Sequence, residues 1–334
     1  MEIEKMNKSG LLDKCKELGI TRCSSKNKSE LIDLINDKMK TSSTTLDVNV
    51  NVNVNANANE NYVLPSTQVT KQIKHLKPLI KWSGGKSDEI KQFEKYIPSE
   101  YDTYIEPFVG GGSVYFYLSP VKAVISDVHS ELVDFYKCVG DEKSNEIYEF
   151  MKTHPNDEET YYQVRDNMIV NDYLDNAKRF YYQRKTCFRG MLRYNKNGKF
   201  NIPFGRYKTI NYNDLGNKNY EELLSKTEIL NQSFEYIFEN YNNENNFMFL
   251  DPPYDSEFTD YGYCQFGKEE QKKLAKLFKE TKIKCLMIIG KTAFIEELYK
   301  DYIVDEYKKM YKFKLYAGRV GDEINTTHLI IKNY

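Results

Sequence analysis

The chain has 334 residues, with 48 lysines and arginines against 49 aspartates and glutamates and a formal net charge of −1. This length is sufficient for two domains, and the near-zero charge gives no global indication of nucleic-acid binding, which depends on where the charges lie. No run of 18 apolar residues is present, so no transmembrane helix is expected, and the N-terminal MEIEKMNKSG lacks the apolar run of a signal peptide.

Cysteine and tyrosine content bear on the compartment and on the surface. The six cysteines form no C-x-x-C pair, and no histidine pair has metal-ligand spacing. We therefore expect reduced thiols, no metal centre and a reducing, cytoplasm-like compartment. Tyrosine is unusually common, at 28 residues. Because cores favour Leu and Phe, many tyrosine rings are expected at surfaces or sites.

Residues 1–40 are predicted to form a small helical module. Leu11 and Cys15 follow helical spacing, Gly19 is expected to end that helix, and Ser29 is expected to cap a second one. This segment resembles SAP-like helix–extended–helix modules, which commonly bind DNA. A packing or protein-docking role is the alternative.

The remainder divides into a linker and an α/β domain. Residues 41–75 contain the low-complexity run VNVNVNVNANANEN; alternation suggests a strand, but Asn disfavours strands, so we expect a disordered linker. From residue 76, strands alternate with helices, which predicts a Rossmann-like α/β fold with a mostly parallel sheet. A helical insertion is expected at about 140–235. The expected strands are Tyr104-Ile105, Ala123-Ile125, Phe247-Leu250, Cys285-Ile289 and His328-Ile331.

Two glycine–lysine pairs superficially match the end of a phosphate-binding P-loop. Gly85-Lys86-Ser87 would require glycine where the chain has Ile80, and Gly290-Lys291-Thr292 would require it at Cys285. A P-loop NTPase is therefore not expected. Trp82, just before the first pair, would by itself fit a core position.

A glycine loop and an aspartate follow two successive predicted strands. Gly110, Gly111 and Gly112 separate an apolar strand from an apolar helix, so that the backbone can approach a ligand and the helix start can offer N–H donors. This arrangement suits an adenosyl cofactor, although a plain tight turn is the alternative. One strand later, Asp127 lies where an acid can bind ribose hydroxyls; helix capping is its alternative role.

The run from Arg184 to Lys208 has the composition of a nucleic-acid contact. It holds eight basic residues, no acidic residue and five aromatic residues. Arginine can read guanine edges, asparagine can read adenine, and aromatic rings can stack or wedge. A solvated surface loop is the alternative interpretation.

The apolar strand 247–250 leads directly into Asp251, Pro252, Pro253 and Tyr254. Two prolines cannot continue a sheet interior, so the strand must end and a stiff loop must follow. An aromatic amino group is a poor nucleophile because its lone pair is delocalised. The Asp251 carboxylate and the Pro252 carbonyl can accept its hydrogen bonds, and Tyr254 can stack on the base. This loop therefore predicts methylation of an amino group on a flat ring.

Together these motifs resemble the alpha-group, Dam-like, D12-class DNA adenine methyltransferases over residues 78–334. The resemblance lies in KWSGGK, EPFVGGGS, CFRGMLRYNKNGKFNIPFGRYK and DPPY, in that order. It implies a site-specific enzyme that transfers a methyl group from S-adenosyl-L-methionine to the 6-amino group of adenine in double-stranded DNA. It further implies base flipping and a GATC-like target site.

The resemblance also implies roles for individual residues. Those expected to contact the cofactor are Trp82, Lys86, Phe108, Gly110, Gly112, Asp127 and Asp251. Those expected to act on the flipped base are Asp251, Pro252, Pro253 and Tyr254. Those expected to bind DNA are Lys185, Phe188, Arg189, Arg193, Asn195, Lys199 and Arg206. Gly290-Lys291-Thr292 departs from the Ser-Asn-x-Asp run of many relatives, and Arg189 stands where some have Asn.

Two other functions fit parts of the pattern. A DNA-binding protein without catalysis would retain the basic run but has no use for an intact Asp251 loop. Enzymes that methylate RNA or a protein amide usually carry Asn at the position of Asp251 and lack this basic run. The sequence does not determine the target site, the oligomeric state or whether a restriction endonuclease is a partner.

Overall fold

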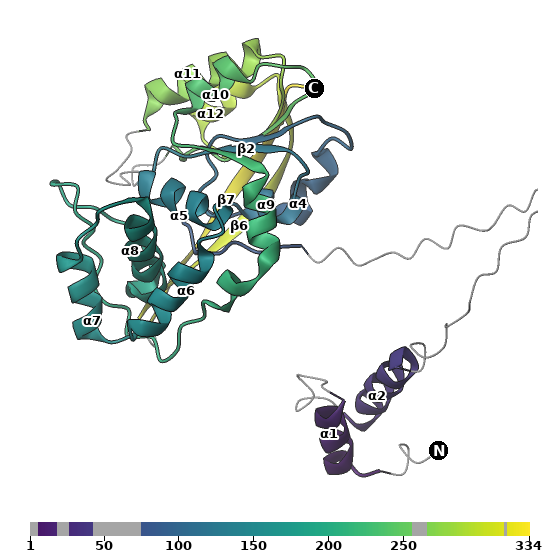
Figure 1. Cartoon of the computed structure of the whole chain (residues 1–334). Coiled ribbons are helices and arrows are strands. Elements are labelled where there is room, and N and C mark those ends of the chain that lie inside the picture. Colours follow the sequence, from purple (N-terminus) through teal and green to yellow (C-terminus); the bar gives the residue numbers. More distant parts are fainter. Residues whose placement is uncertain (1–5, 19–26, 43–74, 256–265, 317–318) are drawn as a thin grey trace, which may run out of the picture. The chain divides into compact units, whose positions relative to one another are not determined.

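The computed structural model describes residues 6–18, 27–42, 75–255, 266–316 and 319–334. The chain divides into two compact units, residues 1–70 and 71–334, and each is described by itself (Figure 1). Most of the predicted linker lies outside the described residues. No helix among those described is long and apolar enough to cross a membrane.

The first unit contains two helices, α1 (Lys8–Glu17) and α2 (Lys28–Ser42). A reciprocal cap starts α2: Glu30 N donates to Asn27 Oδ1 at 3.0 Å, and Asn27 N donates to Glu30 Oε2 at 2.8 Å. The prediction that Ser29 caps this helix was therefore wrong by two residues. The small core shared by the two helices consists of Leu11, Cys15, Leu31 and Ile35.

The second unit is a layered α/β structure. Its strands are β1 (Tyr104–Glu106), β2 (Ala123–Ser126), β3 (Thr227–Leu230), β4 (Phe247–Leu250), β5 (Lys284–Gly290), β6 (Ile303–Tyr316) and β7 (Arg319–Lys332). Its helices are α3 (Ile90–Phe93), α4 (Ser113–Leu118), α5 (Ser130–Gly140), α6 (Ser144–Thr153), α7 (Glu158–Tyr162), α8 (Tyr173–Thr186), α9 (Lys218–Ser225), α10 (Phe234–Asn240), α11 (Lys268–Glu280) and α12 (Ala293–Tyr299). Single turns are 3₁₀ at Glu94–Tyr96, Phe188–Gly190 and Asn213–Gly216, and π-helical at Gln163–Asn167.

The strands form one sheet in the order β3-β2-β1-β4-β5-β7-β6. The first five of these are parallel neighbours, and β7 is antiparallel to both β5 and β6. The predicted Rossmann-like fold with a mostly parallel sheet is confirmed. The edge strands β3 and β6 were not predicted, and β7 begins at Arg319, well before the expected start.

Side chains alternate between two cores on opposite faces of the sheet, as strand geometry requires. On β4, Phe247 and Phe249 pack in one core and Met248 and Leu250 in the other. The first core is completed by α4, α5, α8 and α9, and the second by α10, α11 and α12 (Figure 1). Because both faces are covered, the central strands are mainly apolar, which made them recognisable in the sequence.

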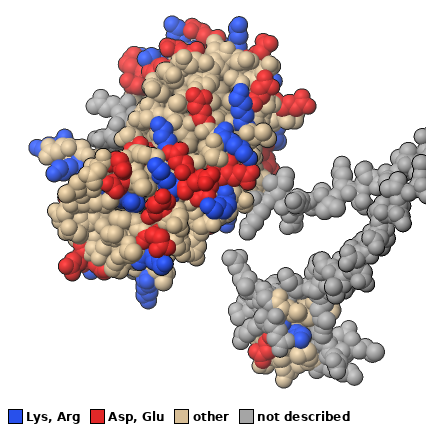
Figure 2. Space-filling model, in the orientation of Figure 1, with Lys and Arg blue, Asp and Glu red and all other residues tan. Residues whose placement is uncertain are grey.

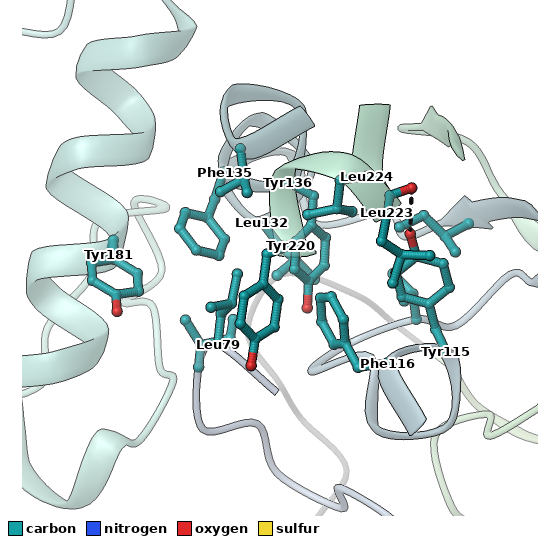
Figure 3. Packing of buried hydrophobic residues seen from close by; sticks show 14 of the residues in the cluster. Leu79, Tyr115, Phe116, Leu132, Phe135, Tyr136, Tyr181, Tyr220, Leu223 and Leu224 are labelled. Atoms are coloured by element: carbon teal, nitrogen blue, oxygen red, sulfur yellow. Dashed lines mark hydrogen bonds between the residues drawn. The ribbon is translucent and has the colours of Figure 1, made fainter. Parts of the chain in front are cut away.

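Tyrosines are prominent in the first core (Figure 3). The largest fully buried side chains include Tyr104, Tyr115, Tyr136, Tyr161, Tyr181, Tyr182 and Tyr299. Several use their hydroxyl groups internally; Tyr136 Oη, for example, donates to Gly110 O at 2.8 Å. The expectation that many tyrosine rings lie at surfaces or sites does not apply to these seven. Burial of five of them is compatible with their hydroxyl groups because each makes an internal hydrogen bond.

The connection from β2 to β3 is long and mainly helical. It leaves the sheet after α5 and returns at α9, and α6, α7 and α8 lie between them. Since β3 pairs with β2 as part of the sheet, the inserted stretch is 141–217, shorter than the expected interval of about 140–235.

Candidate active site

The candidate site lies at the carboxyl ends of β2, β1 and β4, which are adjacent in the sheet. In parallel strands the loops after these ends emerge at the same edge, where α/β enzymes bind ligands. The glycine loop follows β1, Asp127 follows β2, and Asp251 follows β4. Loops distant in the sequence are thus brought together by strand order.

The glycine loop packs closely against Trp82. Gly110 has a φ of 47°, and a Cβ placed there would lie 2.6 Å from the Trp82 ring. No larger residue fits this contact, which explains the glycine beyond a simple turn. Gly112 directly precedes α4, and the half-buried Phe108 ring stacks on Phe234 at 5.5 Å between centroids.

Asp127 supports the glycine loop instead of capping a helix. Its carboxylate accepts hydrogen bonds from Gly110 N at 3.0 Å and His129 N at 2.9 Å. The side chain of His129 caps α5 by accepting from Leu132 N, so the capping alternative for Asp127 was wrong. Burial raises the pKa of Asp127 to about 6, although these backbone hydrogen bonds oppose the rise.

Lys86 and Asp251 form an ion pair at the centre of the site, in which the lysine is buried and the aspartate is partly exposed. Lys86 is 1% exposed, and its Nζ donates to Asp251 Oδ1 at 2.6 Å and to Gly84 O at 2.7 Å. Burial raises the pKa of Asp251 above its ordinary value, and the charge of Lys86 opposes that rise. The segment Lys81–Lys86, called here the opening loop, is therefore joined to the Asp251–Tyr254 loop by a charge-assisted hydrogen bond.

The loop after β4 is held from two directions. Gln271 Nε2 of α11 donates to Pro253 O at 2.7 Å, and Thr292 Oγ1 donates to Asp255 Oδ2 at 3.1 Å. A Cβ placed at Gly290 would lie 3.2 Å from the Tyr254 ring. Gly290-Lys291-Thr292, the segment that differs from the run found in many relatives, therefore packs directly against the Asp251–Tyr254 loop.

The basic run from Arg184 to Lys208 begins in the last turn of α8 and continues as a turn followed by a hairpin. Isolated antiparallel bridges join Cys187 to Phe204 and Tyr194 to Phe200. Phe188 is 38% exposed in the turn.

The predicted DNA-contact residues are spread along this run. Asn195 Oδ1 accepts from the backbone N–H groups of Asn197 and Lys199 and so shapes the hairpin tip. Arg193 Nε donates to Asn201 Oδ1 at 2.7 Å, and Arg189, Arg193, Lys199 and Arg206 are all exposed. Arg206 pairs with Glu158, and Lys185 is half-buried over the Tyr181 ring at 5.0 Å.

Arg184, which the sequence suggests as a surface cation, is 3% exposed. Its guanidinium group donates to Met191 O at 2.7 Å and to Lys81 O, and lies over the Trp82 ring at 5.4 Å. This side chain thus links the turn at 188–191 to the loop that begins at Lys81.

His129 makes a second link, between the basic run and the segment that follows β2. Because Nδ1 of His129 accepts from Leu132 N, the neutral ring carries its proton on Nε2, which lies 2.7 Å from Tyr194 Oη. Tyr194 Oη in turn donates to Glu131. Burial lowers the pKa of His129 to about 4, so this neutral form is maintained at neutral pH.

Charge on the visible surface is mixed. On the face drawn in Figure 2, basic and acidic side chains are interspersed, in keeping with the net charge of −1. Contact with a polyanion on this face would rely on local cations. Among the described residues, no group of three or more His, Cys, Asp or Glu side chains could hold a metal ion.

Two buried acids near the site were not predicted as functional. Glu106, at the end of β1, accepts hydrogen bonds from Tyr104 Oη at 2.6 Å and Tyr115 N at 3.2 Å. Glu89 lies three residues after Lys86 and contacts β6 and β7. Glu106 lies within the EPFVGGGS motif, whereas nothing in the local sequence marks Glu89.

A glycine loop, a strand-terminal acid and an Asp-Pro-Pro-Tyr loop at one edge of this sheet define a Rossmann-like methyltransferase. A family model described as D12 class N6 adenine-specific DNA methyltransferase matches residues 82–313. The chain therefore belongs to this family, and its predicted activity as an adenine-specific DNA methyltransferase is confirmed. The alternatives of RNA, a protein amide or binding without catalysis are set aside.

Individual relatives agree with this assignment. The chain is 62% identical over 261 residues to the type II methyltransferase M.CviBI of Paramecium bursaria Chlorella virus NC1A, covering 78% of this chain and 100% of that one. It is 35% identical to the type II methyltransferase M.MjaIII of Methanocaldococcus jannaschii, covering 71% and 88%. It is 28% identical to the DNA adenine methylase of Haemophilus influenzae, covering 70% and 87%.

Proposed function

We propose that this enzyme transfers a methyl group from S-adenosyl-L-methionine to the 6-amino group of an adenine flipped out of duplex DNA. The observation that carries the proposal is the ion pair of Lys86 and Asp251, which joins the opening loop to the Asp251–Tyr254 loop at 2.6 Å. A GATC-like target is the expectation from the family resemblance.

The residues at the sheet edge fit this cofactor. Gly110 leaves room for Trp82 at the loop, and the buried Asp127 carboxylate lies beside that backbone, where it can accept from ribose hydroxyls. The residues proposed to hold the cofactor are Trp82, Lys86, Phe108, Gly110, Gly112, Asp127 and Asp251. When bound, this cofactor supplies an electrophilic methyl group.

The chain's own residues would orient the target nitrogen. The Asp251 carboxylate and the Pro252 carbonyl accept hydrogen bonds from the adenine amino group, which favours a pyramidal nitrogen with its lone pair directed at the methyl group. Tyr254 stacks on the flipped base. The anchoring of Pro253 O by Gln271 keeps this loop rigid, so that little reorganisation is needed.

The exposed basic run is proposed to contact the DNA. The proposed contacts are Lys185, Phe188, Arg189, Arg193, Asn195, Lys199 and Arg206. The N-terminal unit, with helices α1 and α2, is proposed to act as a SAP-like DNA-binding module joined by a linker. A restriction endonuclease that cuts the same site is a proposed partner, since relatives carry type II names. The described cysteines Cys15, Cys138, Cys187 and Cys285 are free thiols, which supports a reducing compartment.

The central test is methyl transfer from labelled cofactor to unmethylated duplex DNA, followed by sequencing of the methylated positions. Asp251→Ala is expected to abolish N6-methyladenine, whereas Asp301→Ala, an exposed aspartate, should leave it unchanged. Single-stranded RNA is added as a competitor. Activity that survives Asp251→Ala, or labelling that appears in RNA, would overturn this proposal.

A further inference from the structure

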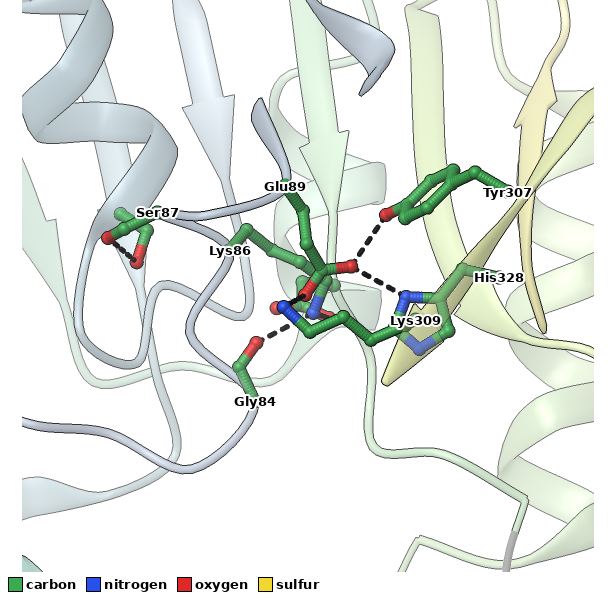
Figure 4. Close-up of polar contacts among 9 residues, drawn as sticks. Gly84, Lys86, Ser87, Glu89, Tyr307, Lys309 and His328 are labelled. Atoms are coloured by element: carbon green, nitrogen blue, oxygen red, sulfur yellow. Dashed lines mark hydrogen bonds and ion pairs between the residues drawn. The ribbon is translucent and has the colours of Figure 1, made fainter. Parts of the chain in front are cut away.

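Glu89 is a buried carboxylate behind the Asp251–Tyr254 loop. It is 3% exposed and accepts hydrogen bonds from Tyr307 Oη and His328 Nδ1, both at 2.7 Å, with Lys309 Nζ 3.2 Å away (Figure 4). Burial opposes ionisation, but the hydrogen bonds from His328 and Tyr307 lower the pKa of Glu89 to about 2. The carboxylate is therefore ionised at neutral pH.

This carboxylate fixes the orientation of His328. An ionised carboxylate can only accept hydrogen bonds, so His328 Nδ1 must carry a proton. His328 is fully buried, and it lies on β7, 239 residues after Glu89. Its ring plane is consequently held by a charge-assisted hydrogen bond rather than by packing alone.

The His328 ring packs edge-on against Tyr254. The two ring centroids are 5.3 Å apart, and the planes cross at 88°. Gly290 is the partner of His328 in the β5–β7 pairing and lies directly against the Tyr254 ring. Lys86 Nζ lies 5.2 Å from the centroid of the same ring. Three segments of the chain therefore define where Tyr254 lies.

We propose that His328, held by Glu89, is a positioning residue that sets the angle of the Tyr254 ring toward the target adenine. This inference rests on the proposed function, in which Tyr254 stacks on the flipped base. An edge-to-face contact restricts rotation of Tyr254, and stacking on a ring at the wrong angle would displace the amino nitrogen from its line of attack. Glu89 and His328 touch neither substrate nor cofactor in this account.

The test compares His328→Asn, Glu89→Gln and the double variant. Asn retains a side-chain donor for Glu89 but lacks the ring, whereas Gln retains the shape of Glu89 without its charge. His328→Asn is expected to lower the single-turnover methyl-transfer rate roughly 10- to 100-fold, with the KM for DNA and the affinity for cofactor within about twofold. Glu89→Gln should give a smaller loss, and the double variant should lose no more than His328→Asn alone, because both act through one ring.

A second readout follows the base itself. A duplex with 2-aminopurine at the target position reports, by its fluorescence, how the flipped base stacks on Tyr254. His328→Asn is expected to change this signal, whereas His154→Asn, which alters a histidine stacked on Phe150 away from the site, should not. Thermal melting establishes that each variant is folded; if His328→Asn does not fold, the rate and fluorescence of Glu89→Gln decide.

The outcomes separate this inference from the proposed function. If the unaltered enzyme makes no N6-methyladenine, the proposed function fails and the inference fails with it. If the unaltered enzyme is active but folded His328→Asn keeps the full rate and the unchanged fluorescence, only the inference is overturned. Additive losses in the double variant would likewise overturn it.

Discussion

Glu106 shows how strongly burial controls the pKa of a single side chain at this site. Burial raises the pKa of Glu106 to about 8, despite the hydrogen bonds from Tyr104 and Tyr115 that favour its charge. The side chain therefore retains its proton at neutral pH in the folded protein, whereas in the unfolded chain it has lost it. Folding is thereby linked to proton uptake.

Substitution of Glu106 should expose this linkage. The pKa of Glu106 in the folded protein lies above its value of 4.5 in the unfolded chain. Proton binding by Glu106 therefore stabilises the folded protein fully below pH 4.5, and this contribution is lost as the pH rises toward 8. The free energy of unfolding of the unaltered protein relative to Glu106→Gln should therefore fall by on the order of 5 kcal/mol across this range. Denaturant titrations at several pH values measure it, and a pH-independent difference would contradict the prediction.

Lys86 should control the ionisation of Asp251. Without this cation, the main opposition to burial is lost and the pKa of Asp251 rises further, so the ionised carboxylate is lost at a higher pH as the solution is acidified. Lys86→Met should shift the acid limb of the pH–rate profile to higher pH and lower the rate at pH 7 by at least about 10-fold. Lys91→Met, at an exposed lysine on α3, serves as the control. An unshifted acid limb would show that Lys86 does not control the ionisation of Asp251.

Strands were predictable from the sequence where the whole segment is buried in the interior of the protein. The strands β1, β2, β4 and β5 are buried on both faces and consist mainly of apolar residues, so their positions were predicted within two residues. The strand β6 carries Lys308, Lys309 and Lys312 and pairs only with β7, so no apolar run marks it. The edge strand β3 is only partly buried and follows helices, which concealed it within the predicted insertion.

Arg184 stabilises the turn at 188–191, a structural role that was not predicted because its charge suggested a surface position. Removing the guanidinium group leaves Met191 O and Lys81 O without their buried donor. Arg184→Met is therefore expected to lower the free energy of unfolding by about 2–4 kcal/mol and to weaken DNA binding. Arg206→Ala, an exposed arginine of the same run, should cost less than about 1 kcal/mol. Equal losses of unfolding free energy in the two variants would contradict the structural role assigned to Arg184.

At the scale of the whole molecule, site motifs were predictable and their supports were not. Asp251, Asp127 and the glycine loop each follow an apolar strand, and the order of parallel strands brings them together. Glu89 and His328 meet only because β7 lies antiparallel beside β5, a pairing that no local pattern reveals. The local sequence therefore reveals the motifs of the candidate site more readily than the residues that support them.

The division into two units also predicts separable contributions. Removing residues 1–70 leaves the sheet and all the residues of the candidate site in place. Turnover at saturating DNA should be nearly unchanged, while DNA affinity should fall, most clearly at raised salt, because a tethered second contact is lost. Binding isotherms at two salt concentrations test this. An unchanged affinity would exclude a DNA-binding role for the first unit.

The contact between α5 and α9 has a further consequence. A Cβ placed at Gly140, the last residue of α5, would lie 3.1 Å from Leu224 O of α9. The two ends of the 141–217 stretch are thus fastened to each other at the sheet. Such a stretch can be exchanged as a cassette if the replacement keeps the contacts that Arg184 makes with Lys81 O and that Tyr194 makes with His129. Grafting the equivalent stretch from a relative should transplant the choice of target sequence onto an unchanged chemical core.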